Sequence, residues 1–341
     1  MKTGDRFSAV QYVGMILLVL AALAVCLSLG SVSISLDTIG KALGKFFSQA
    51  DINSPLERII VFVRLPRVLA VALSGAALSL CGVAMQGLLR NPLADGSTLG
   101  VSSGASLGAV LTIAFGFNVP GFALFGRVGM AVLFAFLSLV LILSLAYRLD
   151  RQLSTHTIIL IGIVYSMFAA ALMSLVLAIA KDRVRDIVFW TMGSLAGTDL
   201  PHVLLLAVSL IIVSIVLFRL RTELNAFAIG ESNAETIGVN VRAVKLTVLI
   251  VASVLIGVTV AIGGTIGFVG LVVPHMVRLV VGPNHQRLVP ASLFGGAIFL
   301  LFADLVARTI VSPLELPIGV ITSLVGAVVF VFLFWRQVRA A

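Results

Sequence analysis

Charged side chains are scarce in this sequence. Asp, Glu, Lys and Arg make up 11% of the 341 residues, whereas hydrophobic residues make up 60%. Soluble domains carry about 25% charged residues, because their surfaces must be hydrated. The apolar runs also recur so evenly that no stretch is left for a soluble domain. The composition therefore predicts an all-α polytopic membrane protein, with a single transmembrane domain over residues 1–341.

Cysteine is nearly absent, since only Cys26 and Cys81 occur and both lie inside apolar runs. This excludes a disulfide framework. The sequence also lacks clusters of His, Cys and carboxylates at metal-ligand spacing, so we expect neither a metal site nor a cofactor in this chain. The formal charge of +9 comes from Lys and Arg scattered through short loops, without a basic stripe, which excludes nucleic acid as a partner.

Ten apolar runs have the length of about 17 to 25 residues that a helix needs to cross the hydrocarbon core of a bilayer. Residues 246–277 form an uncharged stretch that is too long for one crossing. Gly263 and Gly264 offer a reversal point that divides it into two spans. The ten predicted transmembrane helices begin near Val13, Val68, Thr98, Val128, Thr157, Val203, Leu246, Gly264, Val289 and Pro317.

An even number of crossings places both termini on the same side of the membrane. With the termini inside, the cytoplasmic segments hold 13 Lys and Arg residues and the outer segments hold 10. Basic residues prefer the cytoplasmic side, so the sequence favours a multi-pass protein of the cell (cytoplasmic) membrane with both termini in the cytoplasm. Arg58, Arg64 and Arg67 then lie outside, against this rule.

The chain carries only partial matches to catalytic motifs. In "GKALGKF" three residues separate the glycines and Phe46 follows Lys45, so the segment is not a phosphate-binding loop. The segment "GVSSG" matches a nucleophile elbow, and a pair of Ser102 with His275 leaves an intramembrane serine hydrolase as one alternative. The segment fits better as a face of small residues that lets helices pack closely in lipid, formed by Gly100, Gly104 and Gly108.

Few ionisable residues lie inside the predicted spans. Asp304 and Arg308 are four residues apart and share a helix face, so we expect an ion pair within the helix. His275 follows Pro274 in a kinked segment, and we expect it to donate a hydrogen bond to a neighbouring helix rather than to bind a ligand. Ion-coupled secondary transporters need buried carboxylate or His relays, and one acid in ten spans makes such a carrier the weaker alternative.

Residues 219–244 lie between the sixth and seventh predicted spans. The segment "TELNAFAIG" predicts a short helix that carries Leu224 and Phe227 and ends at the following glycine. The segment "ESNAETIG" predicts a second short helix, which begins with a capping box formed by Ser232 and Glu235. The two helices make a rigid unit, here called the elbow, and an exposed apolar face on it is typical of a docking site for another protein.

The outer segment 181–201 is too polar to cross a membrane. Its Trp190 is typical of the membrane interface. The sequence leaves two alternatives open for this segment: a short helix at the mouth of a pore, or a segment that packs across the outer surface.

Seven sequence blocks, in this order, resemble a known family. They are "RLPRVLA", "GAALSLCGVAMQGLLRNPLADGSTLGVSSGAS", "WTMGSLAG", "AIGESNAETIGV", "GTIGFVGLVVPHMVRLVVGPNHQRLVP", "ADLVAR" and "ELPIGVITSLVGA". Together they resemble the FecCD family, the permease subunits of ABC importers for ferric siderophores, haem and cobalamin. The resemblance extends from about Arg58 to Phe334, and it implies the type II ABC importer permease fold with ten spans.

The resemblance also implies partners and cargo. Such a permease pairs with a second permease copy, as a homodimer or with a similar chain, binds two separate ATPase subunits and receives cargo from an extracytoplasmic substrate-binding protein. The chain itself would not be an enzyme, because ATP and Mg would be used by the partner ATPases. We expect a metal-chelate cargo, first a ferric siderophore, with haem and cobalamin as alternatives.

Three groups of residues receive roles from the resemblance. The family's outer arginines, which dock acidic residues of the binding protein, match Arg64, Arg67 and Arg308. A guanidinium fork suits this role, because it pairs with a carboxylate through two parallel hydrogen bonds. The family's coupling helices, which sit in a cleft of the ATPase, match the elbow at Ala228, Gly230, Glu231, Ala234 and Gly238. The positions that narrow the inner end of the pathway match Asn91, Leu93 and Thr155, the expected cytoplasmic gate.

Overall fold

Helices account for all the regular structure that the computed structural model describes, which covers residues 6–30, 32–116, 123–151 and 153–340. The helices in chain order are α1 (Ala9–Ser28), α2 (Leu36–Phe47), α3 (Pro55–Ile59), the π-helix η1 (Ile60–Arg64), α4 (Leu65–Leu89), α5 (Val101–Phe115), α6 (Ala123–Leu149), α7 (Thr155–Ile179), the 3₁₀ turn η2 (Lys181–Arg183), α8 (Val184–Thr191), α9 (Leu200–Arg219), α10 (Arg221–Phe227), α11 (Glu231–Thr236), α12 (Val241–Gly263), α13 (Val269–Val281), α14 (His285–Thr309) and α15 (Ile318–Ala340).

Seven helical stretches of the described chain are long and apolar enough to cross a membrane. They are Ala9–Ser28, Pro55–Leu88, Gly126–Leu149, Thr155–Ile179, Leu200–Arg219, Val241–Gly263 and His285–Thr309. Three shorter apolar helices accompany them: Val101–Phe115, Val269–Val281 and Ile318–Phe332. Each of the ten predicted runs corresponds to one of these helices. Ten complete crossings are not confirmed, because α13 with its 13 residues reaches only about 20 Å of the ~30 Å hydrocarbon core.

The short helices α5 and α13 both follow irregular backbone. Helix α12 ends at Gly263, and Gly264 has a φ of 70°, so the chain turns at the predicted reversal point. Helix α13 begins only after Phe268, whose φ of 66° lies in the left-handed region. Helix α5 likewise follows Gly100, with a φ of 74°. Lipid cannot satisfy irregular backbone, so segments 90–100 and 264–268 belong against protein or a cavity.

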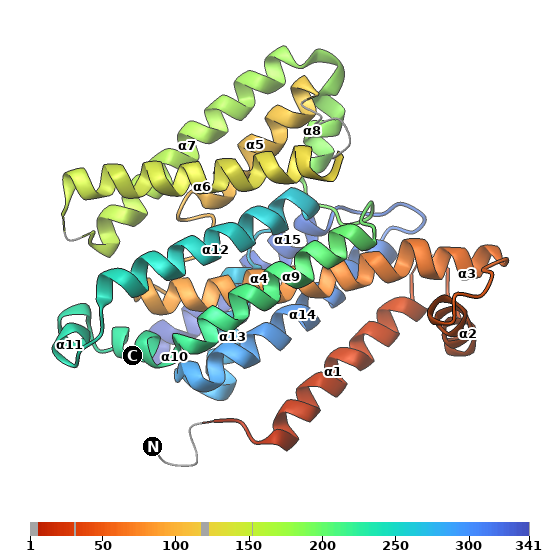
Figure 1. Cartoon of the computed structure of the whole chain (residues 1–341), viewed down its shortest axis with the longest axis horizontal. Coiled ribbons are helices and arrows are strands. Elements are labelled where there is room, and N and C mark those ends of the chain that lie inside the picture. The colour runs from red at the N-terminus through yellow and green to blue at the C-terminus, as the bar shows by residue number, and fades with distance from the viewer. Residues whose placement is uncertain (1–5, 31, 117–122, 152, 341) are drawn as a thin grey trace.

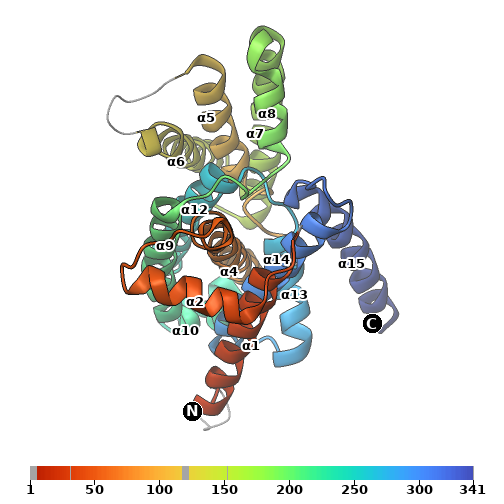
Figure 2. The same cartoon turned by 90° about the vertical axis from the view of Figure 1, so that its right-hand side faces the viewer.

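Helix α4 is the centre of the bundle, as Figure 2 shows along the bundle axis. It packs against α14, α13, α12, α9 and α1. Glycines bring these backbones together: a Cβ at Gly75 would stand 2.2 Å from the carbonyl oxygen of Gly296, and a Cβ at Gly82 would stand 1.9 Å from that of Gly270. Close approach matters in lipid, where van der Waals packing drives much of helix association. Helices α5 to α8 form a second group beside α12.

The two ends of the bundle differ (Figure 1). Helices α2, α3 and α8 lie at one end, named the outer end after the predicted orientation, and α2 runs across it. Helices α10 and α11 lie at the other, inner end. The start of α1 and the end of α15 also lie at the inner end, the arrangement that an even number of crossings predicts.

Candidate docking, coupling and transport sites

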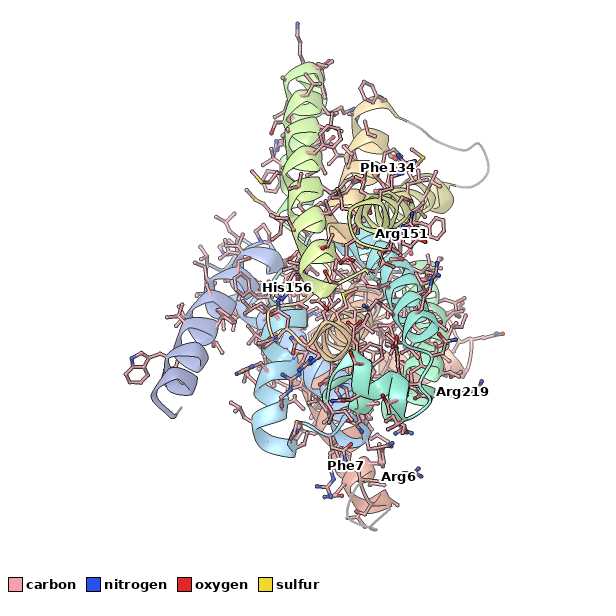
Figure 3. The ribbon with its side chains drawn as sticks, turned by 90° about the vertical axis from the view of Figure 1, so that its left-hand side faces the viewer. Arg6, Phe7, Phe134, Arg151, His156 and Arg219 are labelled. Atoms are coloured by element: carbon pink, nitrogen blue, oxygen red, sulfur yellow. The ribbon has the colours of Figure 1, made fainter. Side chains whose placement is uncertain are left out.

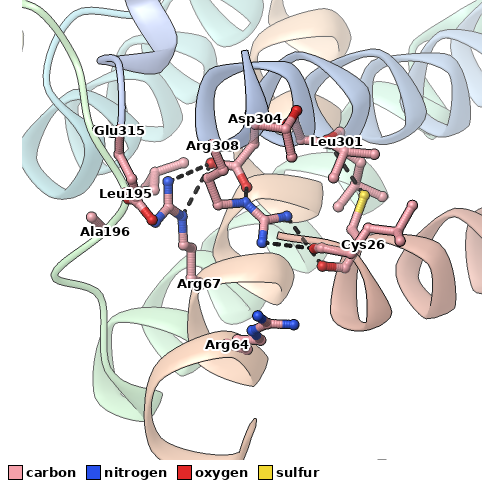
Figure 4. Close-up of polar contacts among 12 residues, drawn as sticks. Cys26, Arg64, Arg67, Leu195, Ala196, Leu301, Asp304, Arg308 and Glu315 are labelled. Atoms are coloured by element: carbon pink, nitrogen blue, oxygen red, sulfur yellow. Dashed lines mark hydrogen bonds and ion pairs between the residues drawn. The ribbon is translucent and has the colours of Figure 1, made fainter. Parts of the chain in front are cut away.

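A network of charges, the arginine cluster, lies at the outer end (Figure 4). It comprises Arg64, Arg67, Asp304, Arg308 and Glu315. Asp304 is central, because Nε of Arg308 lies 2.8 Å from its Oδ2 and Nη2 of Arg67 lies 3.0 Å from its Oδ1. Nη1 of Arg67 also lies 2.6 Å from Oε2 of Glu315. The predicted pair of Asp304 with Arg308 is present, and Asp304 serves a second arginine that sequence spacing could not reveal.

The arginine cluster also holds the end of α1. Arg64 donates to the carbonyl oxygen of Leu27 at 2.8 Å. Arg308 donates to the carbonyl oxygens of Cys26 at 3.1 Å and of Leu29 at 3.2 Å. The last carbonyls of a helix lack intrahelical partners and carry partial negative charge, so these guanidinium groups cap α1.

The three arginines are buried, with exposed fractions of 7% for Arg64, 7% for Arg67 and 3% for Arg308. Their guanidinium groups bond within the chain instead of extending into solvent. They still line a cavity of about 160 Å³ together with Glu315, whose side chain is 37% exposed. Three guanidinium groups face two carboxylates, so the cluster carries one excess positive charge beside this cavity.

The elbow lies at the inner end, and its apolar side chains divide into two sets. Leu224, Phe227 and Ala234 are buried, so the side chains that the sequence offered for docking pack into the protein. The large exposed apolar side chains are Ile229, at 57% exposed, and Ile237, at 63%. Each follows one of the two short helices, so the apolar surface lies at the turns of the elbow rather than along its helices.

Two glycines shape the turns of the elbow. Gly230 has a φ of 113° and Gly238 a φ of 90°, conformations that side chains other than glycine rarely adopt. Gly230 is the N-cap of α11, so the predicted capping box of Ser232 and Glu235 is wrong. The helix starts at Glu231, which places Ser232 inside its first turn. Of the other predicted coupling residues, Ala228 is exposed and caps the end of α10.

Hydrogen bonds fasten the elbow to the rest of the inner end. Asn225 of α10 donates from Nδ2 to Oδ1 of Asn284 at 2.9 Å, and its Oδ1 accepts the backbone N–H of His285 at 2.8 Å. Nζ of Lys245 in α12 lies 2.9 Å from the carboxylate of Glu231 in α11. The elbow is therefore bonded to the starts of both α14 and α12.

The predicted gate residues lie on two separate segments of the inner end. Asn91 accepts the backbone N–H of Leu93 at 2.9 Å in the loop after α4, and Leu93 is exposed. Thr155 is the first residue of α7 and is half-buried. Figure 3 shows this end, with Arg151 just before α7 and His156 in its first turn. Among the described residues no hydrogen bond joins Asn91 or Leu93 to Thr155.

The glycines of the predicted small-residue face lie along α5. A Cβ at Gly104 would stand 2.5 Å from Oγ of Ser138, and a Cβ at Gly108 would stand 2.4 Å from the carbonyl oxygen of Met130. Both neighbours belong to α6, so these glycines bring α5 and α6 together. Gly100 is the N-cap of α5 and has a positive φ, and a Cβ there would stand 3.0 Å from the carbonyl oxygen of Gly162 in α7.

A cavity of about 280 Å³ lies where α4, α5, α12 and the irregular segment 264–268 meet. Its lining includes Asp95, Ser97, Ser102, Ser103 and Thr265. None of the described residues that line it is a histidine, so the cavity does not hold the pair of Ser102 with His275 and gives no support to the serine hydrolase. The hydroxyl groups instead provide polar partners beside the irregular backbone.

The outer segment 181–201 packs across the outer end of α12. The backbone N–H of Ser194 donates to the carbonyl oxygen of Gly263 at 2.8 Å. A Cβ at Gly264 would stand 2.2 Å from the carbonyl oxygen of Trp190. Thr191 also lines the 280 Å³ cavity, so this segment both covers the surface and reaches the cavity wall.

Comparison with known proteins agrees with this architecture. The FecCD transport family matches residues 16–336. The hemin transport permease HmuU of Yersinia pestis is 38% identical over 328 residues, which cover 95% of this chain and 94% of that protein. The molybdate import permease MolB of Haemophilus influenzae is 36% identical over 328 residues, which cover 96% and 95%.

A solved structure has the same fold. It is an ABC transporter of the metal-chelate type in an inward-facing conformation, 34% identical in sequence, with a TM-score of 0.83. The match covers 95% of this chain and 98% of that chain. The chain belongs to the FecCD transport family, and it is a membrane permease of the ABC transporters, which work with ATPases and substrate-binding proteins.

Proposed function

We propose that this chain forms the membrane channel of an ATP-driven importer that moves a metal chelate into the cytoplasm by alternating access. The observation that carries the proposal is the fold shared over 95% of the chain with a metal-chelate transporter. The elbow at the inner end supports it, because a rigid projection with exposed Ile229 and Ile237 fits a motor subunit. In this proposal the inner end faces the cytoplasm, and both termini lie there.

The transporter would contain two copies of this permease and two ATPase subunits, with ATP and Mg bound by the ATPases alone. ATP binding would close the ATPases, and the elbow would carry that movement to the gate at Asn91, Leu93 and Thr155. The first candidate cargo is a ferric siderophore. Haem is the second candidate, because the chain is similar to a hemin permease. Molybdate is the third candidate, because the chain is also similar to a molybdate permease. Cobalamin remains an alternative as well.

Reconstitution distinguishes these cargoes. The permease would be purified with the ATPase and binding protein of its own source and placed in proteoliposomes, with ferric siderophores, haem, cobalamin and molybdate supplied in turn. We expect one of them to raise ATP hydrolysis and to accumulate only when ATP is present. Uptake without an ATPase that is abolished by an ionophore would instead establish an ion-driven carrier. Labelling of Ser102 by a fluorophosphonate would establish the hydrolase.

The arginines of the cluster are already paired within the chain, so a binding protein that docks on them must replace one of these internal contacts. We propose that a carboxylate of the binding protein enters the 160 Å³ cavity and replaces Glu315 on Arg67. Glu315 is the group to leave, because its side chain is 37% exposed whereas that of Asp304 is 1% exposed. The excess positive charge of the cluster favours the incoming acid.

Variant E315Q is therefore expected to bind the binding protein more tightly than the wild type. A neutral amide competes less well for Arg67, and a partly exposed ion pair is worth up to about 1 kcal/mol, so the Kd should fall by about fivefold. The Kd would be measured by surface plasmon resonance on permease in nanodiscs. Variant D37N is the matched control, since it removes the same charge from exposed α2 at the same end. Equal Kd values for E315Q and D37N would count against the exchange.

A further inference from the structure

Lys245 is a buried lysine that joins three segments of the inner end. Its side chain is 3% exposed. Nζ lies 3.0 Å and 2.9 Å from the two carboxylate oxygens of Glu231, the first residue of α11. Nζ also donates to the carbonyl oxygen of Leu153 at 3.0 Å, in the turn between α6 and α7. One ammonium group therefore bonds the elbow, α12 and the approach to α7 together.

The bond from Lys245 joins a turn that Asp150 also holds, by accepting the backbone N–H groups of Leu153 at 3.0 Å and of Ser154 at 2.9 Å. Leu153 has a φ of 52°, a left-handed conformation that residues other than glycine adopt uncommonly. Its carbonyl accepts the bond from Lys245, and the next residue but one is Thr155, where α7 begins. A shift of Lys245 therefore acts on the first turn of α7 through a single hydrogen bond.

Space beside Lys245 allows the elbow to move. A cavity of about 360 Å³ adjoins it, lined mainly by charged and polar groups, which include Arg151, Glu231, Glu235 and Arg242. Glu231 is partly exposed, at 31% of its side chain, whereas Lys245 is enclosed. A buried ammonium group is costly without its partners, so Lys245 follows Glu231 when the elbow shifts.

We infer that Lys245 is a positioning residue that transmits movement of the elbow to the start of α7, and so to the inner gate. This inference rests on the proposed function, since it assigns the elbow's movement to a motor subunit. It also gives Glu231 a role within the chain: its carboxylate holds Lys245, whereas the turns at Ile229 and Ile237 face outward. The carbonyl oxygen of Leu153 needs a hydrogen-bond donor at position 245. The acid and the base of the pair therefore cannot be exchanged without losing this contact.

The test compares variants of the complete transporter in proteoliposomes, with uptake and ATP hydrolysis measured in the same sample. We expect K245M and the exchange E231K/K245E both to lower the number of cargo molecules moved per ATP by about fivefold or more, the usual size of a coupling between sites. The exchange restores the ion pair but cannot donate to Leu153. Variant K245R keeps both contacts and should retain most of the coupling. Variant R6Q, which removes the same charge from an exposed residue at the inner end that does not line this cavity, should behave as the wild type.

Two results would overturn the inference: wild-type coupling in K245M, or full rescue by E231K/K245E. If K245M does not fold, E231A removes the acceptor that ties Lys245 to the elbow, at a partly exposed residue, and must show the same loss of coupling. Failure of the proposed function has a different signature, because the wild-type transporter itself would then show no ATP-dependent uptake.

Discussion

Variant D304A is expected not to accumulate as a folded protein. Asp304 is buried and pairs with both Arg67 and Arg308, so its loss leaves the enclosed Arg308 without a carboxylate and Arg67 with Glu315 alone. Removing one partner from a buried ion pair costs about 3–5 kcal/mol, a large share of the roughly 5–15 kcal/mol by which proteins are stable. The yield of monodisperse protein after solubilisation and its melting temperature measure this loss.

The matched control for D304A is E315A. It removes a carboxylate from the same arginine, but Glu315 is partly exposed and Arg67 keeps Asp304, so the cost should not exceed about 1 kcal/mol. Equal melting temperatures for D304A and the wild type would mean that the arginine cluster does not stabilise the fold.

The second large effect is expected from G82A. The new methyl group would stand 1.9 Å from the carbonyl oxygen of Gly270, which is backbone and can move only if α4 and α13 separate. Overpacking of this kind costs about 1–3 kcal/mol or more, and here it also displaces the irregular backbone before α13. We expect a lower melting temperature and loss of uptake in reconstituted transporters.

Variant G14A is the control for G82A. Gly14 lies in the interior of α1 with nothing within 4 Å of the position of a Cβ, so alanine there meets no neighbour and favours the helix. If G82A and G14A have the same melting temperature, the close approach of α4 and α13 is not needed for stability.

Hydrophobic run length was enough to locate all ten apolar helices, and the glycine pair 263–264 was enough to locate the reversal between α12 and α13. The length of the apolar runs did not reveal that helices α5 and α13 are too short for a full crossing. Their irregular approaches contain left-handed residues such as Phe268 and contacts to other helices, such as the donation from Oγ of Ser166 in α7 to the carbonyl oxygen of Ser97. Neither feature leaves a local signal in the sequence.

The candidate sites show the same limit. Spacing of four residues predicted the pair of Asp304 with Arg308, but Arg67 is 237 residues away from Asp304, and no periodicity connects them. The two glycines were enough to locate the elbow in the sequence. The prediction that the apolar side chains of its helices are exposed was wrong. Leu224 and Phe227 turn inward because α10 packs against α14 and α4, which the sequence of the elbow does not contain.

The capping of α1 has a consequence for biosynthesis. Helix α1 is buried only near its end, at Ala22, Cys26 and Leu27, and the arginine that holds Cys26 lies 282 residues later in the chain. Helix α1 therefore lies in the bilayer without this partner until α14 has been synthesised. It is made before α14 but can be fixed in place only after it.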